Sequence, residues 1–399
     1  MKKIITTLLC LSTIYSVKAA DIYVNNSGQP GTWTTITLAL AASAPGDRIF
    51  VSPYGAYTEN LTILQDVTLT SAVSGTTVNV IGTLTITGTA NMDVRIIGME
   101  FSGACTANTG SAVLGSYADI YLIYCNFAST GTGITAYDFC RMHVLYCNMG
   151  STINIRDGEI RGSEFLDLTI TDGPNAGIGD TIYIVGNQFR RMTWSNDDNY
   201  MFIANNYVYY PGNTYCFYIS KAHYNSVVNN TVVNNTFDSN SSTYAHSTVR
   251  FINTAGLNWS NCVFYNNILK DTQWSVTCGA TVSTCAVTSA NRPQFYYNNL
   301  SSASQAFYQN ITGNVNGGVA IDASGRGTSA IQIDKGSPSL QYYDIDMTRN
   351  DIGTFGGPYS LDNYTATGTG NARVYDLNMP FEIWSGQTPQ VEAEATHTK

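Results

Sequence analysis

Short segments in which apolar and polar residues alternate recur along the chain between residues 97 and 300. In most of them an apolar residue is followed two residues later by a small or polar one, and after two more by another apolar residue. Alternation with a period of two is typical of a β-strand, because every second side chain then points to one face. The nine segments are 97–101, 123–127, 145–149, 161–165, 185–189, 204–208, 228–232, 264–268 and 296–300.

The spacing of these segments predicts how the strands are connected. Their final residues follow one another at intervals of 26, 22, 16, 24, 19, 24, 36 and 32 residues. Such a recurrence, with insertions of variable length, indicates a coil of short strands, because hairpins would place turn signals at shorter intervals. One unit cannot bury its apolar face alone, whereas coils stacked at ~4.8 Å bury a continuous column. The sequence therefore predicts an all-β solenoid.

The middle position of the repeat changes its chemistry along the chain. It is occupied by Met99, Cys125, Cys147, Ser163, Asn187, Asn206, Asn230, Asn266 and Asn298. An isolated inward asparagine would cost about 1–3 kcal/mol, but stacked asparagines can form hydrogen bonds from amide to amide along the column. Alternatively, these asparagines occupy tight bends in the left-handed region of φ and ψ, which asparagine tolerates.

The residues after position 20 predict a cap for the first coil. Residues 34–44 are rich in Ala and Leu and suit a short amphipathic helix, which Pro45-Gly46-Asp47 ends before a strand over residues 48–51. A helix there would cover the open edge of the first coil, which otherwise invites aggregation. From about residue 302 the repeat gives way to Gly- and Ser-rich turns, and residues 360–399 are polar.

Two segments resemble a known family. The run Tyr23-Val24-Asn25-Asn26, the expected helix and residues 45–59 (PGDRIFVSPYGAYTE) resemble the opening of pectin-lyase-like right-handed parallel β-helix proteins. Residues 344–358 (DIDMTRNDIGTFGGP) resemble the closing segment of many secreted bacterial β-helix proteins. The resemblance covers residues 21–360 and implies a right-handed parallel β-helix with a short N-terminal capping helix. We expect the capped β-helix over residues 20–335 and a closing segment with a tail over residues 336–399.

Residues 1–19 read as a secretory signal peptide. A basic Met1-Lys2-Lys3 precedes an apolar run over residues 4–11, and Val17-Lys18-Ala19 supplies the small residues of a cleavage site. This segment predicts a protein that is secreted or held at the cell surface, with the periplasm and the outer membrane as alternatives. After residue 20, no apolar run approaches the about 18 residues that a membrane-spanning helix needs.

Charge and cysteine content narrow the class of partner. The formal charge is −9, and removal of the signal peptide leaves 16 basic and 28 acidic residues, or −12. This balance disfavours nucleic acid as a partner, since a phosphate-binding surface needs clustered Lys and Arg. Eight cysteines remain and permit disulfides after export, with Cys278 and Cys285 as the best pair. No Cys-x-x-Cys or His-rich spacing indicates zinc.

Candidate catalytic residues occur between positions 190 and 223. The resemblance implies that a lyase of this fold abstracts a proton beside a uronate carboxylate with an Arg or Lys base, while a cation such as Ca²⁺ neutralises the acid group. We assign proton transfer to Lys221 and His223. The other predicted site residues are Arg190 and Arg191 for substrate carboxylates, Trp194 and Tyr200 for stacking on sugar rings, and Asp197 and Asp198 for Ca²⁺.

These residues also have structural interpretations. The two arginines can pair with nearby aspartates, Asp197-Asp198-Asn199 can form a turn, and Lys221 and His223 can lie on a loop surface. Of the polygalacturonase motifs, the chain matches the Asp-Asp pair but contains no Gly-His-Gly or Arg-x-Lys, which disfavours hydrolysis. A second charged cluster is interpreted as an exposed ion-pair network, and its members are Arg156, Asp157, Glu159, Arg161, Glu164 and Asp167.

Two functions follow from these observations. The first is a secreted β-helix protein that binds a polysaccharide or a cell surface and has no complete catalytic motif, which the sparse charge and the 27 tyrosines favour. The alternative is a polysaccharide lyase that cleaves an acidic, uronate-containing glycan by β-elimination, with Ca²⁺ as the one expected cofactor. If the protein is an enzyme, a lyase is favoured over a glycoside hydrolase. The charge of −12 repels polyanions at long range unless the binding groove is locally basic.

Overall fold

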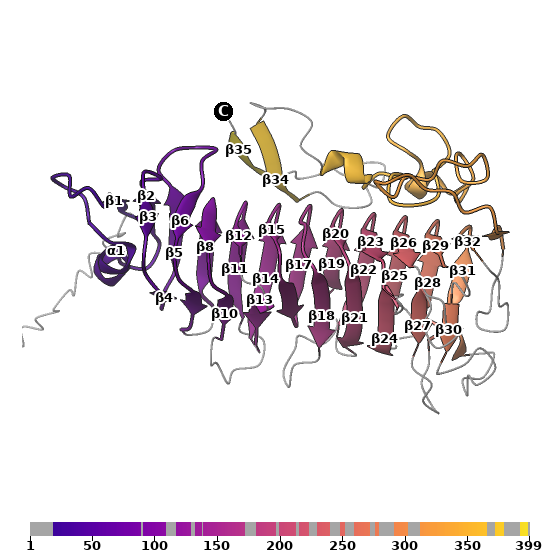
Figure 1. Cartoon of the computed structure of the whole chain (residues 1–399), viewed down its shortest axis with the longest axis horizontal. Helices are drawn as coiled ribbons and strands as arrows, with labels where there is room; N and C mark the ends of the chain where they lie inside the picture. The colour runs from indigo at the N-terminus through magenta and orange to yellow at the C-terminus, as the bar shows by residue number, and fades with distance from the viewer. Residues whose placement is uncertain are drawn as a thin grey trace, which may run out of the picture.

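Three stacks of short parallel strands wind along one axis (Figure 1). This computed structural model describes residues 19–88, 91–108, 117–128, 132–137, 139–171, 181–196, 199–212, 215–222, 230–239, 248–251, 259–271, 276–278, 291–301, 312–364, 372–378 and 392–397. The predicted signal peptide lies outside the described residues except for Ala19, and it stays a prediction.

Each strand pairs in parallel with the strands one coil before and one coil after it. Sheet A consists of β1 (Asp21–Val24), β2 (Asp47–Val51), β5 (Val67–Ser71), β8 (Asp93–Ile97), β11 (Ala118–Ile123), β14 (Cys140–Leu145), β17 (Gly158–Arg161), β19 (Thr181–Val185), β22 (Tyr200–Ala204), β25 (Asn230–Val233), β28 (Cys262–Tyr265) and β31 (Gln294–Tyr296). Sheet B consists of β3 (Ala56–Tyr57), β6 (Val78–Val80), β9 (Met99–Phe101), β12 (Asn126–Phe127), β15 (Asn148–Met149), β20 (Gln188–Phe189), β23 (Tyr207–Tyr210), β26 (Thr236–Ser239), β29 (Ile268–Lys270), β32 (Asn299–Leu300) and β33 (Val315–Asn316), with Glu164 bridging β15 and β20. Sheet C consists of β4 (Leu61–Ile63), β7 (Leu84–Ile86), β10 (Cys105–Ala107), β13 (Thr132–Ala136), β16 (Thr152–Ile155), β18 (Asp167–Thr171), β21 (Arg191–Asn196), β24 (Phe217–Ala222), β27 (Val249–Phe251) and β30 (Val276–Cys278).

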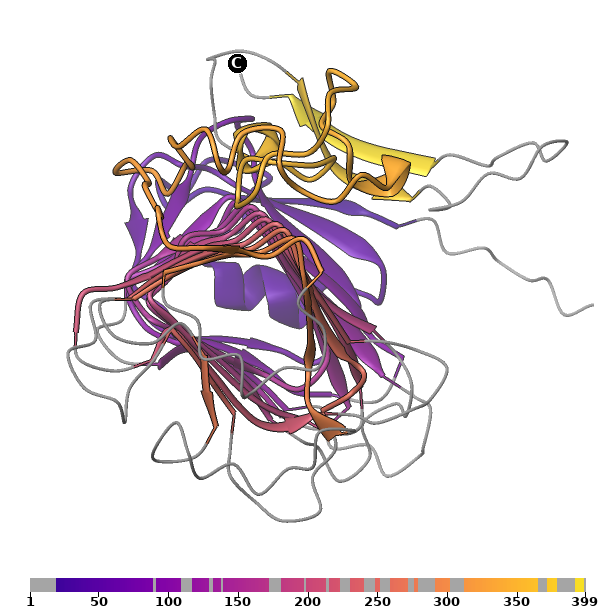
Figure 2. The same cartoon turned by 90° about the vertical axis from the view of Figure 1, so that its right-hand side faces the viewer.

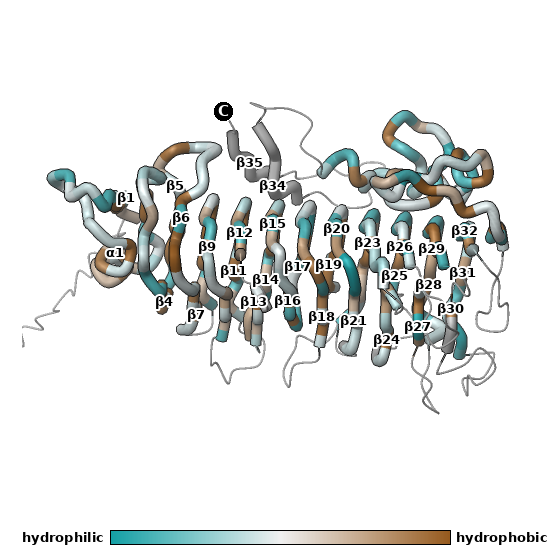
Figure 3. Tube along the Cα trace, in the orientation of Figure 1, coloured by the Kyte–Doolittle hydropathy of each residue, from teal (hydrophilic) through white to brown (hydrophobic). Residues whose placement is uncertain are grey.

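The chain passes through sheets A, B and C in turn, and the strands of successive coils superpose when viewed along the axis (Figure 2). The fold is the predicted right-handed parallel β-helix. Apolar and polar residues alternate along many of its strands (Figure 3). Inward residues such as Ile120, Val144 and Ile184 are fully buried, because stacking of the coils closes the interior into one continuous core.

The corner between sheets A and B carries the repeat that the sequence displays. One residue at each corner has a positive φ, and these residues are Gly98, Tyr124, Tyr146, Gly162, Gly186, Asn205, Asn234, Asn266 and Tyr297. The residue that follows is buried and stacks on its counterparts in the neighbouring coils. From residue 187 onward these stacked residues are Asn187, Asn206, Asn235, Asn267, Asn298 and the half-buried Asn314, whose side-chain amides donate from one to the next over 2.9–3.1 Å. Both structural interpretations of the asparagines therefore apply, at adjacent positions.

The prediction that Asn266 and Asn230 belong to the buried column is wrong. Asn266 occupies the bend, with φ of 55°, and Asn267 takes the column position. Asn230 begins β25, where its Oδ1 accepts a hydrogen bond from the Met201 N–H at 3.0 Å. The sequences VNNTV at 228–232 and VNNTF at 233–237 both fit the repeat, and the second one forms the corner.

The predicted cap is confirmed as α1 (Ile36–Ala42). The Thr35 hydroxyl accepts a hydrogen bond from the Leu38 N–H at 3.2 Å, and the Glu59 carboxylate accepts from the first helical N–H groups, which the helix dipole favours. Ile36 and Ala39 are fully buried in the core, so the helix covers the open end of the first coil (Figure 2).

Residues 317–364, which we call the C-terminal strap, run back along the outside of the coils (Figure 1). The strap contains the short helices η3 (Leu340–Tyr342) and η4 (Leu361–Asn363). Positive-φ asparagines hold it: Asn205 Nδ2 donates to the Thr354 carbonyl at 2.9 Å, and Asn266 Oδ1 accepts from the Ser337 N–H at 2.6 Å. The antiparallel pair β34 (Ala372–Asn378) and β35 (Glu392–His397) follows. The predicted division between residues 335 and 336 stays a prediction.

The structure also bears on the predictions about disulfides and membrane-spanning helices. Six of the described cysteines are buried and form no disulfide: Cys105, Cys125, Cys140, Cys147, Cys216 and Cys262. Cys285, and with it the predicted pair with Cys278, lies outside the described residues. Within the described part of the chain, no helix has both the length and the hydropathy to cross a membrane.

Candidate functional site

The predicted site between residues 190 and 223 is divided between two sheets. Arg190 and Arg191 both contact the Asp167 carboxylate, with nitrogen-to-oxygen distances of 3.4 and 3.2 Å. Arg191 on β21 is the register partner of Asp167 on β18, so this is a cross-strand ion pair on sheet C. The structural interpretation of the two arginines is therefore confirmed.

The two predicted sugar-stacking residues do not lie on one face. Trp194 is on β21 but points inward, is fully buried and stacks on Phe217 at a centroid distance of 6.2 Å. The prediction of a surface role for Trp194 is wrong, because its ring is not accessible to a sugar. Tyr200 begins β22 in sheet A and is 6% exposed.

Of the predicted catalytic and metal residues, the structure describes one backbone position. Lys221 lies near the end of β24 in register with Ser195. It is four register positions from Arg191, or about 13 Å along the strand. His223, Asp197 and Asp198 lie outside the described residues. Among the residues that are described, no three His, Cys, Asp or Glu side chains form a group that could hold a metal ion.

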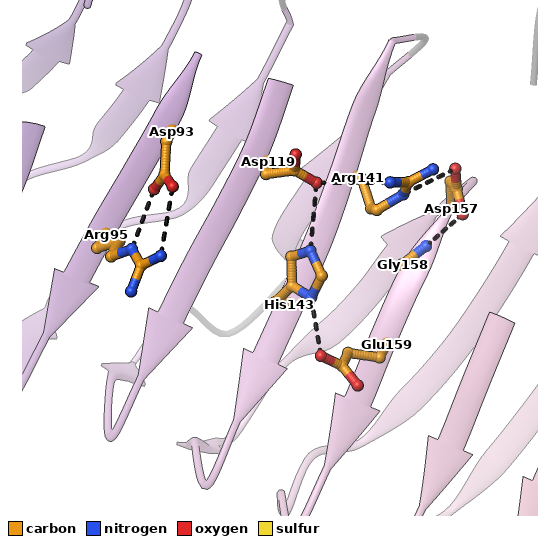
Figure 4. A network of polar contacts seen from close by, with 8 residues as sticks. All are labelled: Asp93, Arg95, Asp119, Arg141, His143, Asp157, Gly158 and Glu159. Atoms are coloured by element: carbon orange, nitrogen blue, oxygen red, sulfur yellow. Dashed lines mark hydrogen bonds and ion pairs between the residues drawn. The ribbon is translucent and has the colours of Figure 1, made fainter. Parts of the chain in front are cut away.

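A different group of polar side chains comes together on the outer face of sheet A. In β11, β14 and β17 the outward residues follow one another in exact parallel register, Tyr121 beside His143 and His143 beside Glu159. One outward row further from sheet B, Asp119 lies beside Arg141. We call the following residues the His143 cluster: Asp119, Arg141, His143, Asp157, Glu159 and Arg161. Figure 4 shows all of them except Arg161.

His143 is held by two carboxylates and an aromatic ring. Its Nδ1 lies 2.8 Å from Glu159 Oε1 and its Nε2 lies 3.4 Å from Asp119 Oδ1. Its ring stacks on Tyr121 with a centroid distance of 4.1 Å, and the guanidinium of Arg95 covers the same tyrosine at 4.8 Å. These contacts fix the imidazole from three sides.

Arginines pair with the remaining carboxylates of the cluster. Arg161 Nε donates to Glu159 Oε2 at 2.5 Å, and Arg141 Nε lies 3.5 Å from Asp157 Oδ2. Asp157, Glu159 and Arg161 form ion pairs as predicted, but the prediction of an exposed network is wrong, because Asp157 is 3% exposed. Asp167 pairs with Arg190 and Arg191 instead, and Arg156 and Glu164 lie elsewhere. An open pocket of about 320 Å³ lies over these side chains and is also lined by Gly158, Thr181 and Tyr183.

The cluster changes the pKa of both its central groups. Burial opposes protonation of His143, but its hydrogen bonds to Asp119 and Glu159 outweigh burial and raise the pKa of the imidazole. Burial alone would raise the pKa of Glu159, but the hydrogen bond from His143 and the charge of Arg161 lower it. The arrangement therefore favours an imidazolium between two carboxylates.

This pair predicts a maximum of stability in mildly acidic solution. The raised pKa of His143 contributes stability below its unfolded value of 6.5, which is lost as the pH rises through the folded pKa. The lowered pKa of Glu159 contributes stability above its unfolded value of 4.5, which is lost as the pH falls through the folded pKa. In urea denaturation, His143→Gln should cost about 1.5–3 kcal/mol at a pH between these values, and less at pH values outside them. A difference that does not vary with pH would contradict this account.

The repeat itself could have revealed this cluster. Three successive strands of sheet A end at Ile123, Leu145 and Arg161. Two residues before these ends lie Tyr121, His143 and Glu159, and four residues before them lie Asp119, Arg141 and Asp157. The outward positions of the repeat therefore carry the signal for this cluster, whereas the buried column does not.

No protein-family model matches this chain. No curated protein matches its sequence. Among solved structures, the crystal structure of pectate lyase Pel9A is similar, with 13% sequence identity and a TM-score of 0.46, over 85% of this chain and 97% of that chain.

Proposed function

We propose that this chain is a secreted parallel β-helix protein that binds an uncharged polysaccharide or cell-surface glycan at the pocket over the His143 cluster. The observation that carries the proposal is the lining of this pocket, in which charged groups of both signs lie beside a half-buried tyrosine. Secretion enters the proposal through residues 1–19 alone.

The lining suits the chemistry of sugar hydroxyl groups, which both donate and accept hydrogen bonds. Asp157 and Glu159 supply acceptors, and the guanidinium groups of Arg141 and Arg161 supply donors. The Tyr183 ring offers an apolar surface to the carbon face of a sugar. With His143 protonated, the three cations and two anions of the lining are balanced by Asp119, which contacts His143 from outside the lining, so the cluster as a whole attracts neither sign of polymer at long range. The formal charge of −9 for the whole chain further disfavours polyanions.

The protonation states favour binding over catalysis. Glycoside hydrolysis needs one carboxyl group that stays protonated, whereas the pKa of Glu159 is lowered. β-Elimination needs a base that is free to accept a proton, whereas the pKa of His143 is raised by the two carboxylates that share it. The lyase alternative depends on Lys221, whose side chain lies outside the description.

A glycan array followed by calorimetry tests the proposal. The wild type should bind one or more neutral glycans, and Tyr183→Ala should weaken that binding at least about tenfold, as expected when a central aromatic contact is removed. Tyr54→Ala is the matched control, since Tyr54 is 75% exposed near the N-terminal end. No binding across the array would refute the proposal. Unsaturated uronate products from pectate, alginate or glycosaminoglycans, tested with and without Ca²⁺, would establish the lyase alternative.

A further inference from the structure

We infer that the pocket over the His143 cluster receives the end of a glycan chain and excludes internal stretches, because the C-terminal strap closes sheet A on one side of it. The inference rests on the proposed function and adds a specificity to it. Outward positions of sheet A are covered on one side of the pocket and accessible on the other.

On the side towards the C-terminal coils, the outer face of sheet A is covered one strand beyond the pocket. The pocket ends at Thr181 and Tyr183 on β19. On β22, Tyr200 and Ala204 are 6% and 0% exposed, and the half-buried Phe202 meets the edge of Tyr359 at a centroid distance of 5.9 Å. A small apolar cluster joins sheet and strap here: Val185, Ala204 and Val233 with Tyr342, Tyr359 and Tyr364.

The end of the strap is fixed in place next to the pocket. Gly186 has a φ of +66°, and a Cβ atom there would lie 2.2 Å from the Tyr364 ring. The same ring lies 6.3 Å from that of Tyr146. Tyr364 therefore fits into a space that a glycine leaves open at the corner between sheets A and B, and the strap forms a wall beside Arg161 and Tyr183.

On the other side of the pocket, towards the N-terminal cap, outward residues of sheet A remain accessible. The side chains of Asp93 and Arg48 are 51% and 53% exposed, and Tyr23 is 50% exposed and stacks on Phe50 at 5.4 Å. From β14 to β1 there are five strand intervals, or about 24 Å at ~4.8 Å each. At these positions the outward side chains of sheet A are therefore accessible to a chain that leaves the pocket in this direction.

A glycan in the pocket can therefore continue in one direction. Its terminal unit would lie against the wall made by Tyr359 and Tyr364, and the rest would extend towards the cap. The pocket volume of about 320 Å³ is at the lower end of the range for small-molecule sites, ~300–1,000 Å³, which suits a terminal unit. An internal stretch would have to displace the strap, so these two tyrosines act as specificity-determining residues.

Binding stoichiometry tests this inference. Oligomers and long polymers of a glycan that binds in the array are titrated into the full-length protein by calorimetry. We expect one protein molecule per glycan chain end of the recognised type, whatever the length of the chain. Reducing one chain end to the alditol identifies which end is recognised, and loss of binding on modification of either end supports the inference. A number of bound proteins that rises with chain length in the wild type would overturn it while leaving the proposed function intact.

Removal of the wall gives the second test. The double variant Tyr359→Ala and Tyr364→Ala should bind several molecules per long chain, whereas Tyr54→Ala should keep the wild-type ratio. Thermal melting confirms that the coils remain folded, and Tyr359→Ala alone serves if the double variant does not fold. If a folded variant without the wall still binds one molecule per chain, the strap is not what selects the end. Complete absence of glycan binding in the wild type refutes the proposed function instead.

Discussion

Replacing Asn206 by leucine is expected to destabilise the protein by about 3–5 kcal/mol. The side-chain Oδ1 of Asn206 accepts hydrogen bonds from the backbone N–H and the amide of Asn187, at 3.0 and 2.9 Å. Its Nδ2 donates to the Ile184 carbonyl at 2.7 Å and to Asn235 Oδ1 at 2.9 Å. Leucine has a similar size but removes these four hydrogen bonds in a fully buried position and leaves the Asn187 N–H without its side-chain acceptor. Each buried group that loses its partner costs about 1–3 kcal/mol.

Urea denaturation followed by circular dichroism measures this loss, with two matched variants beside it. Asn148→Leu changes an exposed asparagine on β15 and should alter stability by no more than about 0.5 kcal/mol. Asn206→Ser should be intermediate, because Ser163 already serves in the same column, where its Oγ accepts from the Cys147 N–H at 3.0 Å. A leucine variant that is more stable than the serine variant would show that volume, and not hydrogen bonding, decides at this position.

The sequence was sufficient to predict the solenoid, its corner column and its cap, since each follows from local chemistry that repeats. The period places the strands, and the residues at the corners alternate between a bend and a buried column position. The error at Asn230 arose where one such local signal, Val-Asn-Asn-Thr, occurs twice within ten residues. Local pattern cannot separate the two, because pairing with the coils before and after decides which one forms the corner.

The prediction of a surface role for Trp194 is wrong because inward and outward residues alternate along β21. Met192 and Trp194 point inward and are fully buried, whereas Arg191 and Thr193 alternate with them. The chemistry of residues and their closeness in sequence do not show on which face of the strand each residue lies. The His143 cluster joins residues that are 16 to 24 positions apart, and the coil register brings them together.

The C-terminal strap could not be predicted from any period. Its contacts join residues far apart, such as Thr354 with Asn205 and Thr236, separated by 149 and 118 positions. Irregular turns and single side chains hold the strap, and no strand of the repeat does so among the described residues. The resemblance of residues 344–358 to a closing segment located the strap in the sequence, but its path over sheet A comes from long-range packing.

Replacing Gly158 by alanine should destabilise the protein by about 3–5 kcal/mol and disrupt the pocket. Gly158 begins β17 with a φ of +118°, and an added Cβ atom would lie 1.9 Å from the Met142 carbonyl oxygen. A backbone carbonyl cannot move aside as a flexible side chain can, so β17 must shift away from β14. The shift would separate Glu159 from His143, whose 2.8 Å contact depends on the register of these two strands.

Two measurements separate this local effect from general destabilisation. Gly150→Ala is the matched control, because no atom lies within 4 Å of an added Cβ there, and its stability should stay within about 0.5 kcal/mol of the wild type. The Gly158→Ala variant should also lose the mildly acidic stability maximum that His143 and Glu159 produce, since that maximum requires their contact. A Gly158→Ala protein that is less stable but keeps this maximum would mean that β17 yields without moving Glu159. In that case the close approach at Gly158 supports the coil but does not position the pocket.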